Sequence, residues 1–268
     1  MVEQTLNIDG INIGFTRRGN GMHVLLLHGY PLDRTIWNQV ADMLAGEMDL
    51  IIPDLRGFGR SDVMAADRSI IEYASDLAGL MERIGARKAH VVGHSMGGYI
   101  ALAFAREFAG KTAGLGLIST QVIADTAERK AARQATAQQI TVEGVGGVVE
   151  SMTPKLSPNA SVQTIVRDVI ARQRPLGLAV ALDAMAGRLD STDVLRSFKS
   201  PVVIIHGDAD ELIPVERGRE MKDLLPTAHY LELPGVGHLP MMENPAAVAE
   251  ALRFLAATKG KGVTILGS

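Results

Sequence analysis

The sequence contains no cysteine and few aromatic residues, and each shortage excludes a class of chemistry. Without cysteine there are no disulfides, no thiolate nucleophile and no cysteine-ligated metal. Aromatic residues make up only 4% of the 268 residues, which argues against a long aromatic-lined groove. No apolar run approaches the roughly 18 residues of a membrane-spanning helix, and no charged-then-apolar leader opens the sequence. We therefore expect a cytoplasmic protein with no membrane partner.

An excess of charge of one sign is also lacking. The formal net charge is −3, and positive and negative side chains are interspersed along the sequence. Because a phosphate backbone requires a positive surface, we expect no nucleic-acid partner. No G-x-G completes the dinucleotide pattern G-x-G-x-x-G, since Asp62 and Pro240 stand where the last glycine would be, and no H-E-x-x-H occurs. We expect neither a cofactor nor a metal site.

Short apolar runs alternate with helical patterns over most of the sequence. The chain has 268 residues, of which 47% are hydrophobic, and this is enough to bury the core of one domain. The alternation is typical of a parallel sheet covered by helices. The expected strands are residues 5–8, 11–15, 24–27, 50–52, 91–92, 115–118, 202–205 and 230–233. Asp9-Gly10 suits a hairpin turn between the first two, and helices are expected at 70–84 and from Asn244-Pro245 to about Ala257.

This alternation stops between residues 121 and 191. The segment has no convincing strand and three or four helical pieces, punctuated by Pro154, Pro158 and Pro175. We interpret it as a helical cap inserted into an α/β core of residues 1–120 and 192–258. Ordinary crossover helices of a larger α/β fold are the alternative. Residues 259–268, which are rich in glycine and lysine, are expected to form a flexible tail.

The motif G-x-S-x-G occupies residues 93–97, between a strand-like run and a helical one. In that setting a sharp turn can present Ser95 as a nucleophile. A serine hydroxyl is too weakly acidic to attack alone, so it needs a base, an orienting acid and donors for the oxyanion. Because the pattern arises by chance in on the order of one chain in ten, the other parts decide its meaning.

Candidates for the acid and the base follow two later strands. Asp208 and Asp210 come just after the run at 202–205, and His238 ends a glycine-rich loop after the run at 230–233. Ligands of open α/β sheets bind at the carboxyl ends of strands, so these groups are expected to meet Ser95 there. The order Ser, Asp, His is that of one known triad. His238 would carry the proton, and one aspartate would fix its tautomer.

The oxyanion donors are expected from two backbone N–H groups. His28-Gly29-Tyr30 ends the run at 24–27, and a loop there can supply the N–H of Tyr30. The N–H of Met96, one residue after the serine, supplies the second donor. His28 itself is interpreted as a brace for this loop, and the histidines at strand ends and inside the motif as packing residues.

Together these segments resemble the α/β-hydrolase family. The matching pieces are residues 28–31, 54–61, 93–98, 207–214 and 237–238. The resemblance implies an α/β fold with an eight-stranded, mostly parallel sheet flanked by helices and a lid after the sixth strand. It also implies the triad Ser95, Asp210 and His238, with Asp210 rather than Asp208 as the acid. Serine at the nucleophile position argues against haloalkane dehalogenases and most epoxide hydrolases, which carry aspartate there.

For function, the resemblance implies a serine hydrolase that cleaves small carboxylic esters or lactones through an acyl-enzyme. Tyr30-Pro31 is similar to the oxyanion loop of arylesterases and of cofactor-free haloperoxidase-type perhydrolases, and residues 177–195 are similar to a segment of enol-lactonases. A perhydrolase, a carbon–carbon bond hydrolase or lyase, and a non-catalytic ligand receptor remain alternatives, and the oligomeric state is open. The expected substrate pocket consists of Met152, Leu182, Met185, Ile213 and Leu239.

Overall fold

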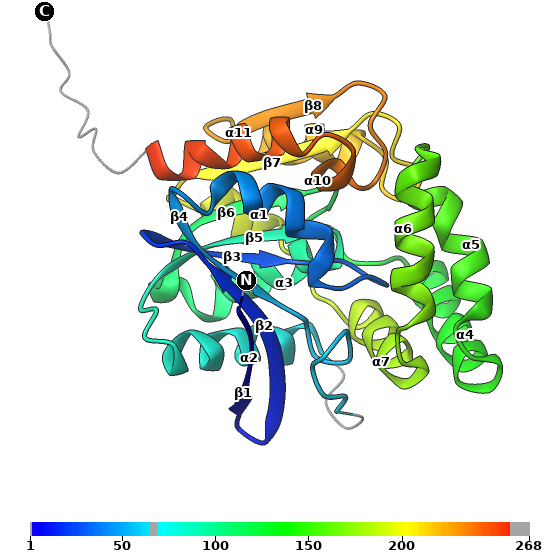
Figure 1. The fold of residues 1–268 in the computed structure, drawn as a ribbon. Coiled ribbons are helices and arrows are strands. Elements are labelled where there is room, and N and C mark those ends of the chain that lie inside the picture. The colour runs from blue at the N-terminus through cyan, green and yellow to red at the C-terminus, as the bar shows by residue number, and fades with distance from the viewer. Residues whose placement is uncertain (1, 65–68, 258–268) are drawn as a thin grey trace, which may run out of the picture.

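The computed structural model describes residues 2–64 and 69–257, and the predicted tail at 259–268 lies outside this range. An eight-stranded sheet lies between two layers of helices, and four further helices stand at one end of it (Figure 1). The strands are β1 (Val2–Ile8), β2 (Ile11–Arg18), β3 (Met22–Leu27), β4 (Met48–Pro53), β5 (Ala89–His94), β6 (Thr112–Ile118), β7 (Val202–Gly207) and β8 (His229–Leu233). The predicted fold class is confirmed.

The sheet has the order β1-β2-β4-β3-β5-β6-β7-β8. β1 and β2 form the predicted hairpin, in which Asp9 and Gly10 have φ values of 47° and 97°. This left-handed backbone matches the twist of the two strands. β2 is antiparallel to β4, whereas all pairs from β4 to β8 are parallel. Every residue of β4, β5 and β7 is buried, as expected of strands covered on both faces.

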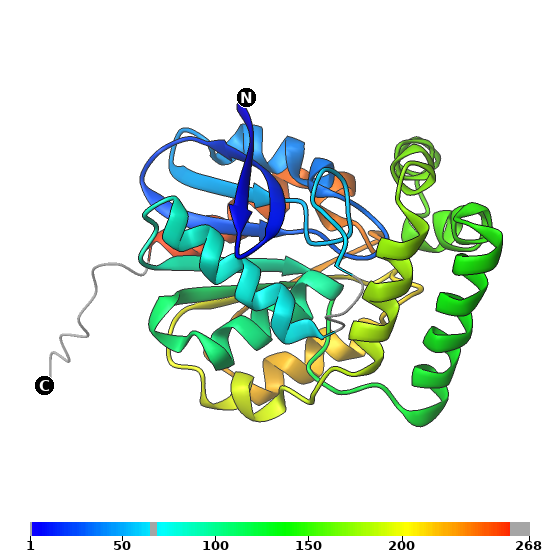
Figure 2. The ribbon, with the colours of Figure 1, turned by 90° about the horizontal axis from the view of Figure 1, so that it is seen from below.

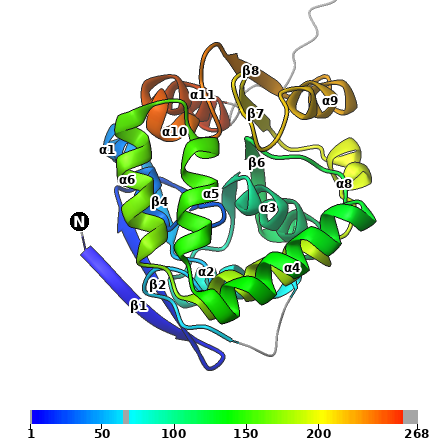
Figure 3. The same cartoon turned by 90° about the vertical axis from the view of Figure 1, so that its right-hand side faces the viewer.

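Helices cover both faces of the sheet (Figure 3). One layer consists of α1 (Asn38–Leu44), α10 (Pro240–Glu243) and α11 (Pro245–Ala257), and the other of α2 (Ile70–Arg83), α3 (Met96–Glu107), α8 (Thr192–Ser197) and α9 (Glu216–Leu224). The described residues also form the 3-10 helices η1 (Arg34–Trp37) and η2 (Ala109–Lys111). Ser69 caps α2 by accepting the N–H of Glu72. Trp37, Phe15 and Phe104 are among the largest fully buried side chains of the core.

Four helices connect β6 to α8 and stand beyond the sheet (Figures 1 and 2). They are α4 (Ala127–Glu143), α5 (Gly146–Leu156), α6 (Ala160–Ala171) and α7 (Pro175–Ala186). α4 packs along α7, and α5 packs along α6. The junction of α6 and α7 is tied to the core, because Arg172 bonds to Asp33 and Gln173 accepts the N–H of Gly59. In the described part of the chain, no helix has both the length and the apolar character needed to cross a membrane.

Candidate active site

Ser95 occupies a tight turn between β5 and α3. Its φ is 51°, a value that side-chain-bearing residues rarely adopt. A Cβ at Gly93 would overlap the carbonyl oxygen of Gly97, and a Cβ at Gly97 would lie 2.6 Å from the carbonyl oxygen of Leu27. Both glycines are therefore required by close backbone packing. The N–H of Ser95 donates to the carbonyl of Ile118 at 2.9 Å, which fixes the turn to β6.

His238 and Asp210 meet from two different loops. His238 Nδ1 donates to Asp210 Oδ2 at 2.7 Å, and both side chains are buried. The other carboxylate oxygen accepts the N–H groups of Leu212 and Ile213 at 2.9 and 3.0 Å. Burial alone would raise the pKa of Asp210, but the charge of His238 and hydrogen bonds from His206, His238 and the N–H of Ile213 hold that pKa far below its ordinary value. Asp210 stays ionised, and its bond to Nδ1 holds the imidazole in one orientation.

Asp208, the other candidate acid, binds the backbone of the loop after β8. Its side chain belongs to an exposed residue and accepts the N–H of Gly235 at 2.6 Å. This bond holds the turn that follows β8 rather than the imidazole. The structure thus brings Asp210, and not Asp208, to His238.

Two histidines that the sequence indicated only as packing residues bind the loops that carry His238 and Ile213. His94 Nε2 donates to the carbonyl oxygen of His238 at 2.8 Å. The centroids of the two rings lie 4.7 Å apart, and the angle between the ring planes is 60°. Burial lowers the pKa of His94 well below its ordinary value, so it is neutral. His206 Nε2 donates to the carbonyl of Ile213 at 2.8 Å. In the sequence, only the position of His94 inside the motif at 93–97 indicated that one of these histidines lies near the site.

The loop after β3 lies directly against Ser95. A Cβ at Gly29 would come within 2.9 Å of the Cβ of Ser95, so this loop passes beside the serine. Met96 is the first residue of α3, and the first N–H groups of a helix have no acceptor within it. Gly29 and the start of α3 therefore flank Ser95, and donation by the N–H groups of Tyr30 and Met96 stays a prediction.

His28 braces this loop and is not exposed to solvent. Its Nδ1 donates to the carbonyl of Gly29 and its Nε2 accepts the N–H of Leu55, both at 3.0 Å. Both ring nitrogens are thus used in one neutral tautomer. Burial lowers the pKa of His28, which keeps it neutral.

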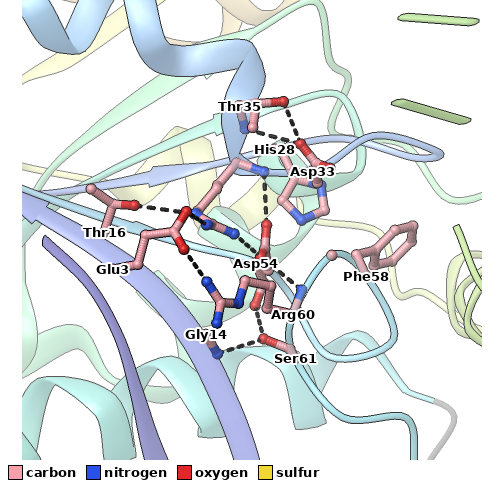
Figure 4. A network of polar contacts seen from close by, with 12 residues as sticks. Glu3, Gly14, Thr16, His28, Asp33, Thr35, Asp54, Phe58, Arg60 and Ser61 are labelled. Atoms are coloured by element: carbon pink, nitrogen blue, oxygen red, sulfur yellow. Dashed lines mark hydrogen bonds and ion pairs between the residues drawn. The ribbon is translucent and has the colours of Figure 1, made fainter. Parts of the chain in front are cut away.

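Residues 54–61 form a polar scaffold next to His28 (Figure 4). Asp54 accepts the backbone N–H of Arg34 at 3.0 Å and that of Arg60 at 2.9 Å, and it forms an ion pair with the Arg34 side chain. Ser61 donates to the carbonyl of Asp54 and accepts the N–H of Gly14. These bonds tie residues 54–61 to the loop that follows β3.

A cavity of about 390 Å³ opens between Ser95, His238 and the helices α4, α5 and α7. Its volume suits a small organic molecule. Four of the expected pocket residues line it, namely Met152, Leu182, Met185 and Ile213. Leu239, the fifth, is fully buried and does not line this cavity. The basic side chains of Arg129, Arg133 and Lys155 also line it, and sequence reasoning did not find them because polar helix positions usually face solvent.

A family model described as the alpha/beta hydrolase family matches residues 24–251 of this sequence. The chain belongs to this family. A thermophilic esterase from Thermogutta terrifontis, solved with malate bound, is 38% identical, with a TM-score of 0.89 over 96% of this chain and 97% of that one. Lipase 3 of Moraxella sp. (strain TA144) is 29% identical over 83% of this chain and 73% of its own length. A non-heme haloperoxidase of Rhodococcus erythropolis is 28% identical over 92% and 97%.

Proposed function

We propose that this alpha/beta hydrolase is a serine hydrolase that cleaves carboxylic esters or lactones through an acyl-enzyme. One observation carries the proposal: Ser95 and His238 line the same cavity, and the His238 imidazole is fixed by the buried, ionised Asp210. The esterase and lipase relatives named above support the same class of reaction. The assignment to the hydrolases rests on the family, and the proposal that the chain cleaves esters or lactones through a serine rests on this geometry and on these relatives.

The steps follow from the positions of the groups. Ser95 Oγ attacks the carbonyl carbon of the substrate and gives its proton to His238 Nε2. The N–H groups of Tyr30 and Met96 bind the oxyanion, and Asp210 stabilises the imidazolium. When the tetrahedral intermediate collapses, the alcohol leaves with the proton from His238. A water molecule, deprotonated by His238, then releases the acid and restores Ser95.

Replacement of the nucleophile tests this function. Ser95→Ala is expected to abolish p-nitrophenyl acetate hydrolysis above the enzyme-free rate, with an unchanged melting temperature. A fluorophosphonate should label the wild type on the tryptic peptide that contains Ser95 and should not label the variant. Ser161→Ala, which removes an exposed serine from α6, serves as the control and should keep both the turnover and the label. Undiminished hydrolysis by Ser95→Ala would disprove the mechanism.

A second activity is favoured by the oxyanion loop and by the haloperoxidase relative. Tyr30 lines the same cavity as Ser95, and hydrogen peroxide in place of water would convert the acetyl-enzyme into peracetic acid. We expect peracid to form from p-nitrophenyl acetate and peroxide. The measurement is peracid above the enzyme-free and Ser95→Ala controls, and its absence would remove this second activity.

A further inference from the structure

The wall of the catalytic cavity carries an excess of positive charge. Arg129 and Arg133 lie one helical turn apart on α4, and Lys155 lies on α5. All three line the cavity together with Ser95 and His238, and none of the lining residues in the described chain is acidic. Lys155 is exposed and forms no ion pair with a described residue. An uncharged ester would gain no electrostatic attraction from these positive side chains.

One buried carboxylate lies behind this wall, and it neutralises the cations only in part. Asp125 contacts Arg133 Nε at 2.6 Å, Arg188 Nη1 at 2.8 Å and Arg129 Nε at 3.4 Å. Burial would raise the pKa of Asp125, but Arg133 and Arg188 lower it below its ordinary value, so it is ionised. Arg129, Arg133 and Arg188 thus share the charge of Asp125, and Arg188 also lies in the field of Asp190. With Lys155 and Asp190 included, four positive and two negative groups give the cluster a net charge of +2 at neutral pH.

Arg133 is held in place with part of its guanidinium group free. Its Nε is bound to Asp125 and its Nη1 lies 3.4 Å from Met185 Sδ, so the plane of the group is fixed. Nη2 has no hydrogen-bond partner among the residues that the structure describes. A fixed guanidinium group with free N–H donors is well suited to bind a carboxylate.

The hydroxyl of Tyr30 is a second donor without a partner. The residue is only 7% exposed, lines the same cavity, and its Oη has no hydrogen-bond partner among the described residues. Burial raises the pKa of this hydroxyl far above its ordinary value, and the charge of Arg133 acts in the opposite direction. The group therefore stays protonated and lies within the field of Arg133. A buried hydroxyl without a partner is uncommon, and a ligand atom in the cavity would satisfy it.

We propose that Arg133, Tyr30 Oη and Lys155 form a carboxylate-binding subsite, so that the natural substrate is an ester that carries a second, ionised carboxylate. The inference rests on the proposed function of Ser95, and it narrows the substrate from esters in general to anionic esters. Arg133 and Tyr30 donate to the carboxylate, and Lys155, at the cavity rim, attracts it. Arg129 adds charge and supports Asp125.

Two pairs of esters test the subsite and show which side of the ester bears the carboxylate. Monomethyl adipate carries it on the acyl side, and 6-acetoxyhexanoate carries it on the alcohol side. The neutral partner of each is the corresponding primary amide, which has nearly the same shape. We expect kcat/KM for at least one acid to exceed that for its amide by about tenfold or more at low ionic strength.

Variants assign this preference to residues. Arg133→Gln should reduce the acid-to-amide ratio to about one, and Tyr30→Phe, which removes only the unpaired hydroxyl, should lower it roughly threefold or more. Lys130→Gln is the matched control, because it removes a positive charge from α4 at a residue that does not line the cavity, and its ratio should stay within about twofold of the wild type. Equal use of acids and amides by the wild type, or an unchanged ratio in both Arg133→Gln and Tyr30→Phe, would overturn the proposal.

Binding of adipate separates failure of the subsite from failure of the proposed function. Adipate should raise the melting temperature of the wild type and of Ser95→Ala, and it should not raise that of Arg133→Gln. Fluorophosphonate labelling with no effect of adipate would refute the subsite and leave the serine hydrolase intact. An effect of adipate without labelling or turnover would support the subsite and refute the proposed function.

Discussion

At the scale of single residues, two aspartates near the end of β7 show how burial separates similar side chains. Asp210 is buried against His238 and bound by two backbone N–H groups, whereas Asp208 is exposed and bonded to Gly235. From the residues alone both were candidates, because they lie two positions apart after the same strand. The resemblance to a family selected Asp210, and the contacts explain the choice.

Replacement of each aspartate by asparagine should therefore have very different effects. Asp210→Asn keeps the shape but removes the charge that fixes the tautomer of His238, so kcat should fall by roughly 10³- to 10⁴-fold. Asp208→Asn keeps an acceptor for Gly235 and should lower kcat by less than about threefold. The measurement is steady-state hydrolysis of p-nitrophenyl acetate, with melting temperatures to confirm folding. The reverse ranking would transfer the role of acid to Asp208.

The cations of the cavity show what residue patterns leave undetermined. Arg129 and Arg133 are spaced by four, which indicates that they share one face of a helix. The spacing does not say whether that face meets solvent or a cavity, and α4 is so polar that only Ala137 and Ile140 are buried in it. In the fold, α4 packs along α7, and this packing turns Arg129 and Arg133 toward the cavity that contains Ser95.

At the scale of elements, the sequence located the strands better than the helices at 121–191. All eight predicted strands are present, because continuous apolar runs such as residues 202–205 have no alternative to burial in a sheet. The helical pieces expected there, roughly residues 125–140, 147–152, 161–173 and 178–189, differ from α4, α5, α6 and α7 by one to four residues at their ends. α7 is buried on almost every side between α4 and the core, so its sequence lacks the alternation that marks a helix face.

The turn at residues 93–97 gives a prediction for a single element. Gly93→Ala places a Cβ on the carbonyl of Gly97, which cannot move without displacing Ser95, so we expect a loss of about 2–3 kcal/mol of stability and most of the activity. Gly110→Ala, in η2, adds a Cβ with no atom within 4 Å and should change neither. Urea denaturation and ester hydrolysis measure both effects. A stable, active Gly93→Ala would show that the turn tolerates a side chain.

At the scale of the whole molecule, buried ionisable groups connect the core with the helices above it. Asp33 lies in the core, and burial would raise its pKa, but hydrogen bonds from Thr35 and from Arg172, just past α6, hold that pKa below its ordinary value. Similar causes lower the pKa of Asp125 and Asp210. Each of these carboxylates binds fewer protons in the folded state than in the unfolded chain, as do the buried His28 and His94.

The free energy of unfolding should therefore decrease with acidification in two stages. A group whose pKa is lower in the folded state than in the unfolded chain stabilises the fold at pH values above its unfolded pKa. This stabilisation is lost as the pH falls toward the folded pKa. His28 and His94 act first, below about pH 6.5, because the unfolded chain takes up protons that the folded state excludes. The aspartates follow below about pH 4, when protonation breaks pairs such as Asp33 with Arg172.

Urea denaturation at intervals between pH 8 and pH 3 measures this dependence. Each proton that the unfolded state binds in excess contributes a slope of about 1.4 kcal/mol per pH unit. Asp33→Asn keeps an oxygen that can cap η1 but cannot ionise, so its stability should be lower at pH 7 and should fall less steeply below pH 4. A flat profile down to pH 3, or parallel profiles for the wild type and Asp33→Asn, would show that these buried groups do not control acid stability.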